Sequence, residues 1–191
     1  MNSDLSMNSA RTIDANRTTA HGRIDQYELI RPLGGGGFGV VYLANDTVAG
    51  VEVAVKGLPS LIRNNTEELE RIRKNFALVS KLHHPHIAAA LHLHLAREAT
   101  YASEDAFKSL RVQQGDTLMV MEYAPGVTLS QWRRQFPDER VPVGIALTII
   151  GQIADALDFA HNAKIIHRDI KPANVMVETR EDGSVFARLL D

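Results

Sequence analysis

A run of glycines constrains the fold of this chain more than any other feature of its sequence. Gly34, Gly36 and Gly39 are spaced as G-x-G-x-x-G between two apolar stretches. Because glycine adopts backbone conformations that other residues avoid, such a run permits a tight turn whose N–H groups approach phosphate oxygens. The stretch that follows, 40–44, is rich in β-branched residues and predicts a strand, whereas a dinucleotide-binding fold would place a helix there. Taken alone, the run also fits a flexible turn without a ligand.

A third strand is predicted by alternation and β-branching over 51–56, and it ends in Lys56. An ammonium group on the inward face of an apolar strand requires an anionic partner, because an unpaired buried charge is costly. The strand after the glycine hairpin can place Lys56 beneath the glycine run. Considered by itself, a lysine at this position is more often an exposed residue at a strand end.

The rest of the pattern predicts five strands and one helix, then a mainly helical part, which is an α+β fold. Asn65 is a candidate helix cap, with Glu68 three residues later. The predicted apolar face of this helix comprises Leu69, Ile72, Phe76 and Val79. The other expected elements are strands at 87–94 and 116–123, a polar insertion or short helical excursion at 96–115, a short helix at 129–135, a long helix opened by Pro142, and a hairpin of 175–178 with 185–190.

Composition excludes several classes of function. The formal net charge of -2 gives no general electrostatic attraction to nucleic acid or anionic membranes. The chain has no cysteine, which excludes disulfides, cysteine nucleophiles and cysteine-based zinc sites. We expect no membrane segment within the chain, no secretory signal at its start, and a cytoplasmic location, although an anchor further downstream stays open. Residues 1–22 are polar and are expected to form a flexible tail.

The segment 166–174 carries the strongest chemical signal, I-H-R-D-I-K-P-A-N. Asp169 can accept the proton of a hydroxyl, and Lys171 can neutralise charge on a transferred phosphoryl group. Asn174 can bind a metal ion through its amide oxygen, and Pro172 stiffens the loop that holds all three. This combination of residue types predicts phosphoryl transfer.

Over residues 27–191 the chain resembles eukaryotic-type (Hanks-type) serine/threonine protein kinases. The glycine run, the V-A-V-K strand and the H-R-D-I-K-P-A-N loop occur in the order of that family. The segment 120–126, V-M-E-Y-A-P-G, resembles the linker between the two kinase lobes. Leu189-Leu190-Asp191 resembles the strand that enters the D-F-G motif, and Lys171 is typical of serine/threonine rather than tyrosine kinases.

The resemblance implies a two-lobed fold, with a five-stranded antiparallel lobe and one large helix over 27–123. The hinge and the first part of a helical lobe would span 124–191. The implied ligands are ATP and Mg²⁺, and the implied partner is a protein with a serine or threonine acceptor. The residues that would bind ATP are Leu33, Gly34, Gly35, Gly36, Gly37, Phe38, Gly39, Val41, Ala54, Lys56, Met121, Glu122 and Ala124.

Within that set, Met121 would be the gatekeeper, and the backbone of Glu122 and Ala124 would bond the adenine. Asp169 and Lys171 would be catalytic. Asn174 and Asp191 would hold Mg²⁺.

The sequence departs from the kinase pattern in two respects. The helix glutamate that should pair with Lys56 is expected at the position of Asn75, which carries no charge. The sequence ends at Asp191, so we expect it to be a partial domain. These departures support a rival interpretation, a pseudokinase or ATP-binding scaffold without catalytic activity. The motifs and the alanine- and aspartate-rich composition are typical of a bacterial member of the family.

A second cluster of polar residues is formed by histidines on the predicted strand 87–94. Alternation places His92 and His94 on the same face of that strand. The pair could form a metal site. We prefer the interpretation that the histidines have a structural role, since the kinase pattern already accounts for His84-Pro85 at the preceding turn.

Overall fold

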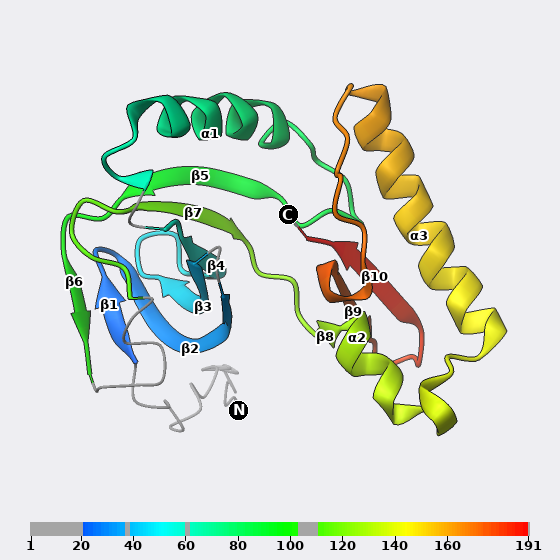
Figure 1. Cartoon of the computed structure of the whole chain (residues 1–191). Coiled ribbons are helices and arrows are strands. Elements are labelled where there is room, and N and C mark those ends of the chain that lie inside the picture. Colours follow the sequence, from blue (N-terminus) through cyan, green and yellow to red (C-terminus); the bar gives the residue numbers. More distant parts are fainter. Residues whose placement is uncertain (1–20, 37–38, 60–61, 103–110, 191) are drawn as a thin grey trace, which may run out of the picture.

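The computed structural model describes residues 21–36, 39–59, 62–102 and 111–190. An antiparallel sheet covered by one helix forms the N-terminal part, and a small sheet packed against a long helix forms the C-terminal part (Figure 1). The flexible tail predicted for 1–22 lies outside the described residues, apart from His21 and Gly22. The α+β class and the two-part architecture predicted from the sequence are confirmed.

The N-terminal sheet has seven strands among the described residues, in the order β5-β7-β4-β3-β2-β1-β6. Five of them were expected, and β1 and β6 are additional. The strands are β1 (Gly22–Ile24), β2 (Tyr27–Gly36), β3 (Gly39–Asp46), β4 (Val51–Gly57), β5 (Ala90–Leu95), β6 (Ala99–Tyr101) and β7 (Thr117–Glu122). All neighbouring pairs are antiparallel.

The two additional strands correct two boundaries of the sequence analysis. Gly22, assigned to the tail, pairs with Leu29 at the start of β1. The stretch 96–115, expected to be an insertion or a helical excursion, contributes β6, whose Thr100 pairs with Arg23. Each strand has only three residues, too few for alternation to be visible in the sequence. Residues 103–110 of the insertion lie outside the described residues.

The core of the N-terminal sheet is built from alternate residues of its strands. Val40 and Tyr42 of β3 and Val53 and Val55 of β4 are almost completely buried. Successive strand residues point to opposite faces, so the residues between them face the other side of the sheet. This alternation aims Val41, Ala54 and Lys56 away from the core.

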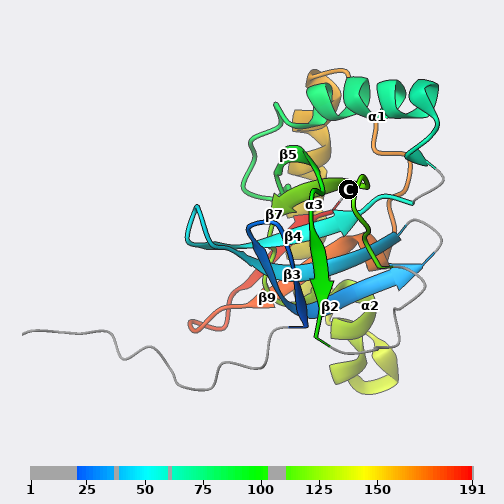
Figure 2. The ribbon, with the colours of Figure 1, turned by 90° about the vertical axis from the view of Figure 1, so that its left-hand side faces the viewer.

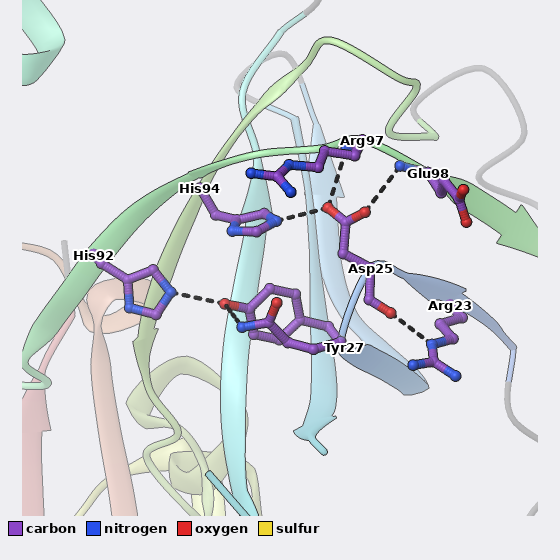
Figure 3. Close-up of polar contacts among 8 residues, drawn as sticks. Arg23, Asp25, Tyr27, His92, His94, Arg97 and Glu98 are labelled. Carbon is purple, nitrogen blue, oxygen red and sulfur yellow. Dashed lines mark hydrogen bonds and ion pairs between the residues drawn. The ribbon is translucent and has the colours of Figure 1, made fainter. Parts of the chain in front are cut away.

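The two histidines of β5 connect this strand to the β1–β2 turn and to the start of β2 (Figure 3). His94 Nε2 donates to Asp25 Oδ2 at 2.6 Å, and His92 Nε2 shares a hydrogen bond with the Tyr27 hydroxyl at 2.7 Å. Asp25 also accepts the backbone N–H groups of Arg97 at 3.0 Å and Glu98 at 2.9 Å. The histidines therefore have structural partners, and the described residues contain no group of three side chains suited to a metal ion.

Asp25 is ionised in this setting. Burial opposes its charge and would raise its pKa, but the hydrogen bonds from Arg97, His94 and Glu98 together hold the pKa of the carboxyl below its usual value. The carboxylate thus connects the β1–β2 turn to the segment that leads from β5 to β6.

Helix α1 (Thr66–Val79) lies over β5 on one side of the sheet (Figures 1 and 2). The Asn65 side chain accepts the Glu68 N–H at 3.0 Å, which confirms the predicted cap. Its apolar face is the one expected, with Leu69, Ile72 and Phe76 partly covered. No residue of α1 is fully buried, so the helix is held by one face only.

The C-terminal part begins after β7 and contains a three-stranded sheet, β10-β9-β8, packed against a long helix. Its core includes Trp132, Ile149, Ile153, Val177 and Leu189. The predicted hairpin is confirmed, whereas the short helix predicted at 129–135 divides into α2 and η3. The elements are β8 (Val127–Thr128), α2 (Leu129–Trp132), η3 (Arg133–Gln135), η4 (Pro137–Glu139), α3 (Val143–Asn162), η5 (Pro172–Asn174), β9 (Val175–Thr179) and β10 (Val185–Leu189).

Helix α3 bears on the expectation that the chain has no membrane segment, which stays a prediction. The helical stretch 137–162 is long enough to cross a bilayer, and an 18-residue window within it has a mean hydropathy of 1.5, with 22% of that window buried. The sequence analysis saw no such segment because the apolar residues are interrupted by polar ones. Ile149, Ile153, Ala156 and Ala160 face the core, so α3 is also a packing helix of this part of the fold.

Candidate functional site

A cavity of about 630 Å³ lies between the N-terminal sheet and the C-terminal part. The hairpin β2–β3 covers it, β4 and β7 form its back, the connection after β7 forms one edge, and η5 and β9 form its floor. Residues from all of these elements line it: Arg31, Leu33, Gly34, Gly35, Gly39, Val41, Ala54, Lys56, Ala88, Met121, Glu122, Tyr123, Ala124, Gly126, Val127, Thr128, Gln131, Ala173, Asn174, Met176 and Leu190.

The roof of the cavity is the predicted glycine hairpin. Leu33, Gly34, Gly35 and Val41 line the cavity, and Gly36 pairs with Gly39 near the tip. Gly39 has a φ of +99°, and a Cβ there would lie 1.8 Å from the carbonyl oxygen of Gly57. Only glycine fits this position, because the backbone of β4 approaches it so closely. Gly37 and Phe38 lie outside the described residues.

The back of the cavity is formed by the residues of β4 that face away from the core. Ala54 pairs with Met121, and Lys56 pairs with Val41 on one side and Met119 on the other. This register brings together an apolar surface from Ala54 and Met121 and one ammonium group beneath the glycine hairpin. The predicted placement of Lys56 under the glycine run is therefore observed.

The helix residue opposite Lys56 was predicted to be Asn75 in place of a glutamate. Asn75 is exposed on α1, and α1 packs mainly on β5. The nearby acids of the helix make surface ion pairs instead, Glu68 with Arg71 at 2.5 Å and Glu70 with Arg73 at 3.0 Å. The assignment of Asn75 to the position opposite Lys56 stays a prediction from the sequence.

The edge of the cavity is the connection between the two parts of the fold. Glu122 ends β7, and its N–H donates to the carbonyl of Ala89 at 2.8 Å. The N–H group of Glu122 is therefore not available to a ligand in the cavity. Ala124 is nearly buried and lines the same edge, and Arg31 donates to the Tyr123 hydroxyl at 3.3 Å across the opening.

The loop 166–174 brings the three predicted chemical residues together. Lys171 Nζ lies 2.7 Å from Asp169 Oδ2, and Asn174 Nδ2 donates to the same oxygen at 2.9 Å. Asn174 also donates to the Asp169 carbonyl at 2.9 Å. Asn174 lines the cavity, while Asp169 and Lys171 lie just beyond the lining. One carboxylate thus has a cation and an amide on one side and solvent on the other.

The shape of this loop is fixed by local contacts. His167 Nε2 hydrogen-bonds to the Leu190 carbonyl at 2.8 Å, and the Leu190 N–H donates to the Asn174 carbonyl at 2.8 Å. Arg168 adopts a positive φ of 68°, which turns the chain sharply before Asp169. These contacts hold the loop against the end of β10, immediately before Asp191. Asp191 itself lies outside the described residues.

Asp169 remains ionised to low pH. The hydrogen bond from Lys171 has the largest effect, that from Asn174 follows, and together they hold the pKa of the Asp169 carboxyl below its usual value. A carboxylate with a low pKa orients a hydroxyl by accepting its hydrogen bond and takes the proton only when the acceptor becomes acidic during reaction.

The chemistry of Asn174 fits a divalent cation. Its amide nitrogen makes both hydrogen bonds to Asp169, so its amide oxygen points away from that residue. Amide and carboxylate oxygens are the ligands that Mg²⁺ accepts. The second predicted ligand, Asp191, follows Leu190, which lines the same floor.

Several residues of the site were missed by sequence reasoning. Met176 of β9 lines the floor, since Val175 and Val177 on either side of it face the core. Alternation along 175–178 could have revealed it. Thr128 and Gln131 line the edge at the start of α2, where a capping box joins them. The T-x-x-Q spacing was a usable signal for that cap.

Comparison with known proteins agrees with this geometry. The model of the protein kinase domain family matches residues 27–191. The serine/threonine-protein kinase PrkC of Bacillus subtilis is 33% identical over 157 residues, which are 80% of this chain and 21% of PrkC. Pkn1 of Myxococcus xanthus is 28% identical over 169 residues, 88% of this chain and 21% of Pkn1.

A solved structure shows the same fold. The PknI kinase domain of Mycobacterium tuberculosis superposes with a TM-score of 0.67 at 26% identity, covering 91% of this chain and 62% of that one. The chain belongs to the protein kinase family, and its relatives are named serine/threonine kinases of the type that the motifs indicated. It spans about a fifth of the length of PrkC and Pkn1.

Proposed function

We propose that this chain provides the nucleotide site and catalytic loop of a protein serine/threonine kinase, which transfers the γ-phosphoryl group of ATP to a serine or threonine hydroxyl. The observation that carries the proposal is the contact of Lys171 and Asn174 with a single oxygen of Asp169, at the floor of a cavity roofed by glycines. A binding module needs the cavity but has no use for the cluster of Asp169, Lys171 and Asn174 beside it.

The cavity suits ATP along its length. Val41, Ala54 and Met176 give the cavity an apolar part that suits a purine ring, and Glu122 and Ala124, whose backbone groups would bond the base, line its edge. The glycine hairpin and Lys56 lie over the other end, where a triphosphate meets backbone N–H groups and one cation. The ligand would thus span from the connection between the two parts to the catalytic loop.

Magnesium would be held by Asn174, through the amide oxygen that faces away from Asp169, and by Asp191 as the second predicted ligand. The ion would supply positive charge that offsets the charge developing on the phosphates. The acceptor hydroxyl would then be oriented by the side chains of the loop 166–174.

Asp169 and Lys171 carry the transfer step. The Asp169 carboxylate accepts the hydrogen bond of the acceptor hydroxyl and so aims its oxygen at the γ-phosphorus. The new bond forms between that oxygen and phosphorus as the bond to the ADP oxygen breaks, and the hydroxyl proton passes to Asp169. Lys171, 2.7 Å from the carboxylate, lies close enough to stabilise charge on the moving phosphoryl group.

The test is phosphoryl transfer from γ-labelled MgATP to casein by the chain and by Asp169→Ala. We expect labelled serine or threonine with the unsubstituted chain, and a loss of at least ~100-fold in the variant, the usual scale for removing a general base. Binding of ATP should survive the substitution, since Asp169 does not line the cavity. Binding without transfer by the unsubstituted chain would instead support the scaffold alternative, to which the uncharged Asn75 is suited.

We also propose a cytoplasmic location, which is where a kinase of this type meets ATP. The expected partners are ATP and a protein substrate, with no role for nucleic acid, in keeping with a formal net charge of -2. Fractionation of cells that express the tagged chain tests the location.

A further inference from the structure

An arginine of β10 reaches the edge of the cavity from outside it. Arg188 Nη1 lies 2.8 Å from Glu122 Oε1, and the two residues are far apart in sequence. Their side chains are 22% and 42% exposed, so water screens the pair only in part. Glu122 lines the cavity, which makes its side-chain anchor relevant to the ligand.

Glu122 is held from a second direction as well. Its N–H donates to the Ala89 carbonyl at 2.8 Å, and its second carboxylate oxygen lies 3.4 Å from the Ala89 N–H. The segment that contains Ala89 is bonded in turn to β10, because Leu189 donates to His86 and Ala88 donates to Leu189, both at 2.9 Å. The contacts form a closed ring from the hinge through 86–89 to β10 and back through Arg188.

Stability alone does not explain Arg188. Its Nε atom is buried and has no hydrogen-bond partner among the described residues. A partly exposed ion pair contributes little to folding, and a buried donor without a partner costs free energy. The Phe186 ring lies 5.4 Å from the guanidinium and fixes its direction. The arrangement favours a geometric role for the side chain.

We propose that Arg188 is a positioning residue for base recognition. By holding the Glu122 side chain, it fixes the end of β7 so that the Glu122 carbonyl and the Ala124 N–H meet the edge of a purine. The inference rests on the proposed function, since it takes ATP as the ligand. It adds a determinant of selectivity for adenine that neither touches the nucleotide nor lines the cavity.

The chemical consequence concerns the 6-position of the purine. The 6-amino group of ATP can donate to the Glu122 carbonyl, whereas the 6-oxo group of ITP cannot. N1 of ATP accepts from the Ala124 N–H, whereas N1 of ITP carries a hydrogen. Discrimination between these two nucleotides therefore reports how well the two backbone groups are placed, and the phosphate contacts, common to both, cancel in the ratio.

The experiment measures the dissociation constants of MgATP and MgITP by competition against a fluorescent ATP analogue, for the full chain and its variants. The full chain should prefer ATP by about tenfold, the scale of one or two net hydrogen bonds. Arg188→Met keeps the aliphatic bulk and removes the ion pair, and we expect its preference to fall to roughly twofold. A loss caused only by loosened folding would weaken both nucleotides equally and leave the ratio unchanged.

Arg180→Met is the matched control. Arg180 lies on the same hairpin and also stacks on Phe186, 4.0 Å from the ring, but its side chain does not reach the hinge. The preference of Arg180→Met for ATP over ITP should equal that of the unsubstituted chain. The charge-exchanged pair Arg188→Glu with Glu122→Arg should recover most of the preference for ATP, because it restores the tie with reversed signs. Thermal unfolding of each variant shows that it is folded.

Each outcome decides between distinct claims. An unchanged ATP/ITP ratio in Arg188→Met, or an equal fall in Arg180→Met, would overturn the role of Arg188 and leave the kinase proposal standing. Equal binding of ATP and ITP by the unsubstituted chain would remove base recognition by the hinge, and the inference with it. If the chain binds neither nucleotide, the proposed function itself fails.

Discussion

At the scale of single residues, the catalytic loop shows how few contacts are needed to set the state of one carboxylate. Asp169 is fully exposed on one side, so desolvation does little to it, and two hydrogen bonds determine its acidity. The sequence was sufficient to predict this group, because Asp169, Lys171 and Asn174 lie within six positions of one another and a proline stiffens the loop. The same reasoning could not reach Arg188, whose partner Glu122 is distant in sequence and is met only through the folded hinge.

We expect Lys171→Met to raise the pKa of Asp169 toward its ordinary value. The lysine favours the charged form of the carboxylate through a hydrogen bond and through its charge, so its removal makes the carboxylate easier to protonate. The carboxyl ¹³C resonance of Asp169, followed between pH 2 and pH 7, gives the titration midpoint. Lys164→Met serves as the control, because it removes a charge two residues before this loop from a lysine that is not bonded to Asp169. A midpoint that stays in place in Lys171→Met would contradict the assignment.

At the scale of elements, five of the seven strands in the N-terminal sheet follow from sequence patterns, because β-branched residues alternate along them. β1 and β6 do not, since three residues each carry no period, and both depend on pairing with distant strands. The predicted strand 87–94 begins later than expected, at Ala90, because Ile87 forms a bridge with Leu189 of the C-terminal part instead. Tertiary partners decided these boundaries, and the sequence does not reveal tertiary partners.

The Asp25 cluster predicts a measurable contribution to folding. Asp25→Asn removes the charge that accepts three hydrogen bonds, and we expect it to lower the free energy of unfolding at pH 7 by about 1–3 kcal/mol. Because the pKa of Asp25 is lowered on folding, its contribution is present above the usual pKa of 3.8 and is lost as the pH falls through the folded value.

The measurement is urea unfolding of both proteins at pH 7 and at a series of pH values that descends well below 3.8. The difference between them should shrink at the lower pH values, where the unsubstituted chain also loses the charge. Hydrogen exchange of 22–24 in Asp25→Asn should be faster than in the unsubstituted chain. A difference that is the same at all pH values would show that the carboxylate acts by shape and not by charge.

At the scale of the whole molecule, the fold places a cavity between two parts that differ in how well they are enclosed. The N-terminal sheet has a closed core, whereas α3 exposes an apolar face on the outside of the C-terminal part. Val143, Leu147 and Ile150 on that face are 75%, 63% and 62% exposed. Apolar surface of this kind is typical of a contact with further protein.

We therefore expect the chain to self-associate at high concentration through α3. Leu147→Glu should reduce the association while changing the free energy of unfolding by no more than about 0.5 kcal/mol, because the side chain is exposed. Size-exclusion chromatography with light scattering gives the mass. Ile149→Glu, two positions away on the buried face, should unfold the chain instead. Unchanged association in Leu147→Glu would place the contact elsewhere.

Strand β5 shows how an edge strand can exclude wrong pairings through its two faces. Its histidines meet Tyr27 and Asp25 on one side, whereas Leu91 and Leu95, which alternate with them, are 46% and 61% exposed. A slip of one residue would turn His92 and His94 away from Tyr27 and Asp25 and bring leucine side chains against the Asp25 carboxylate, which disfavours the new register. The alternation of histidine and leucine along 92–95 therefore disfavours misregistered pairing at the edge of the sheet, where a foreign strand could otherwise add.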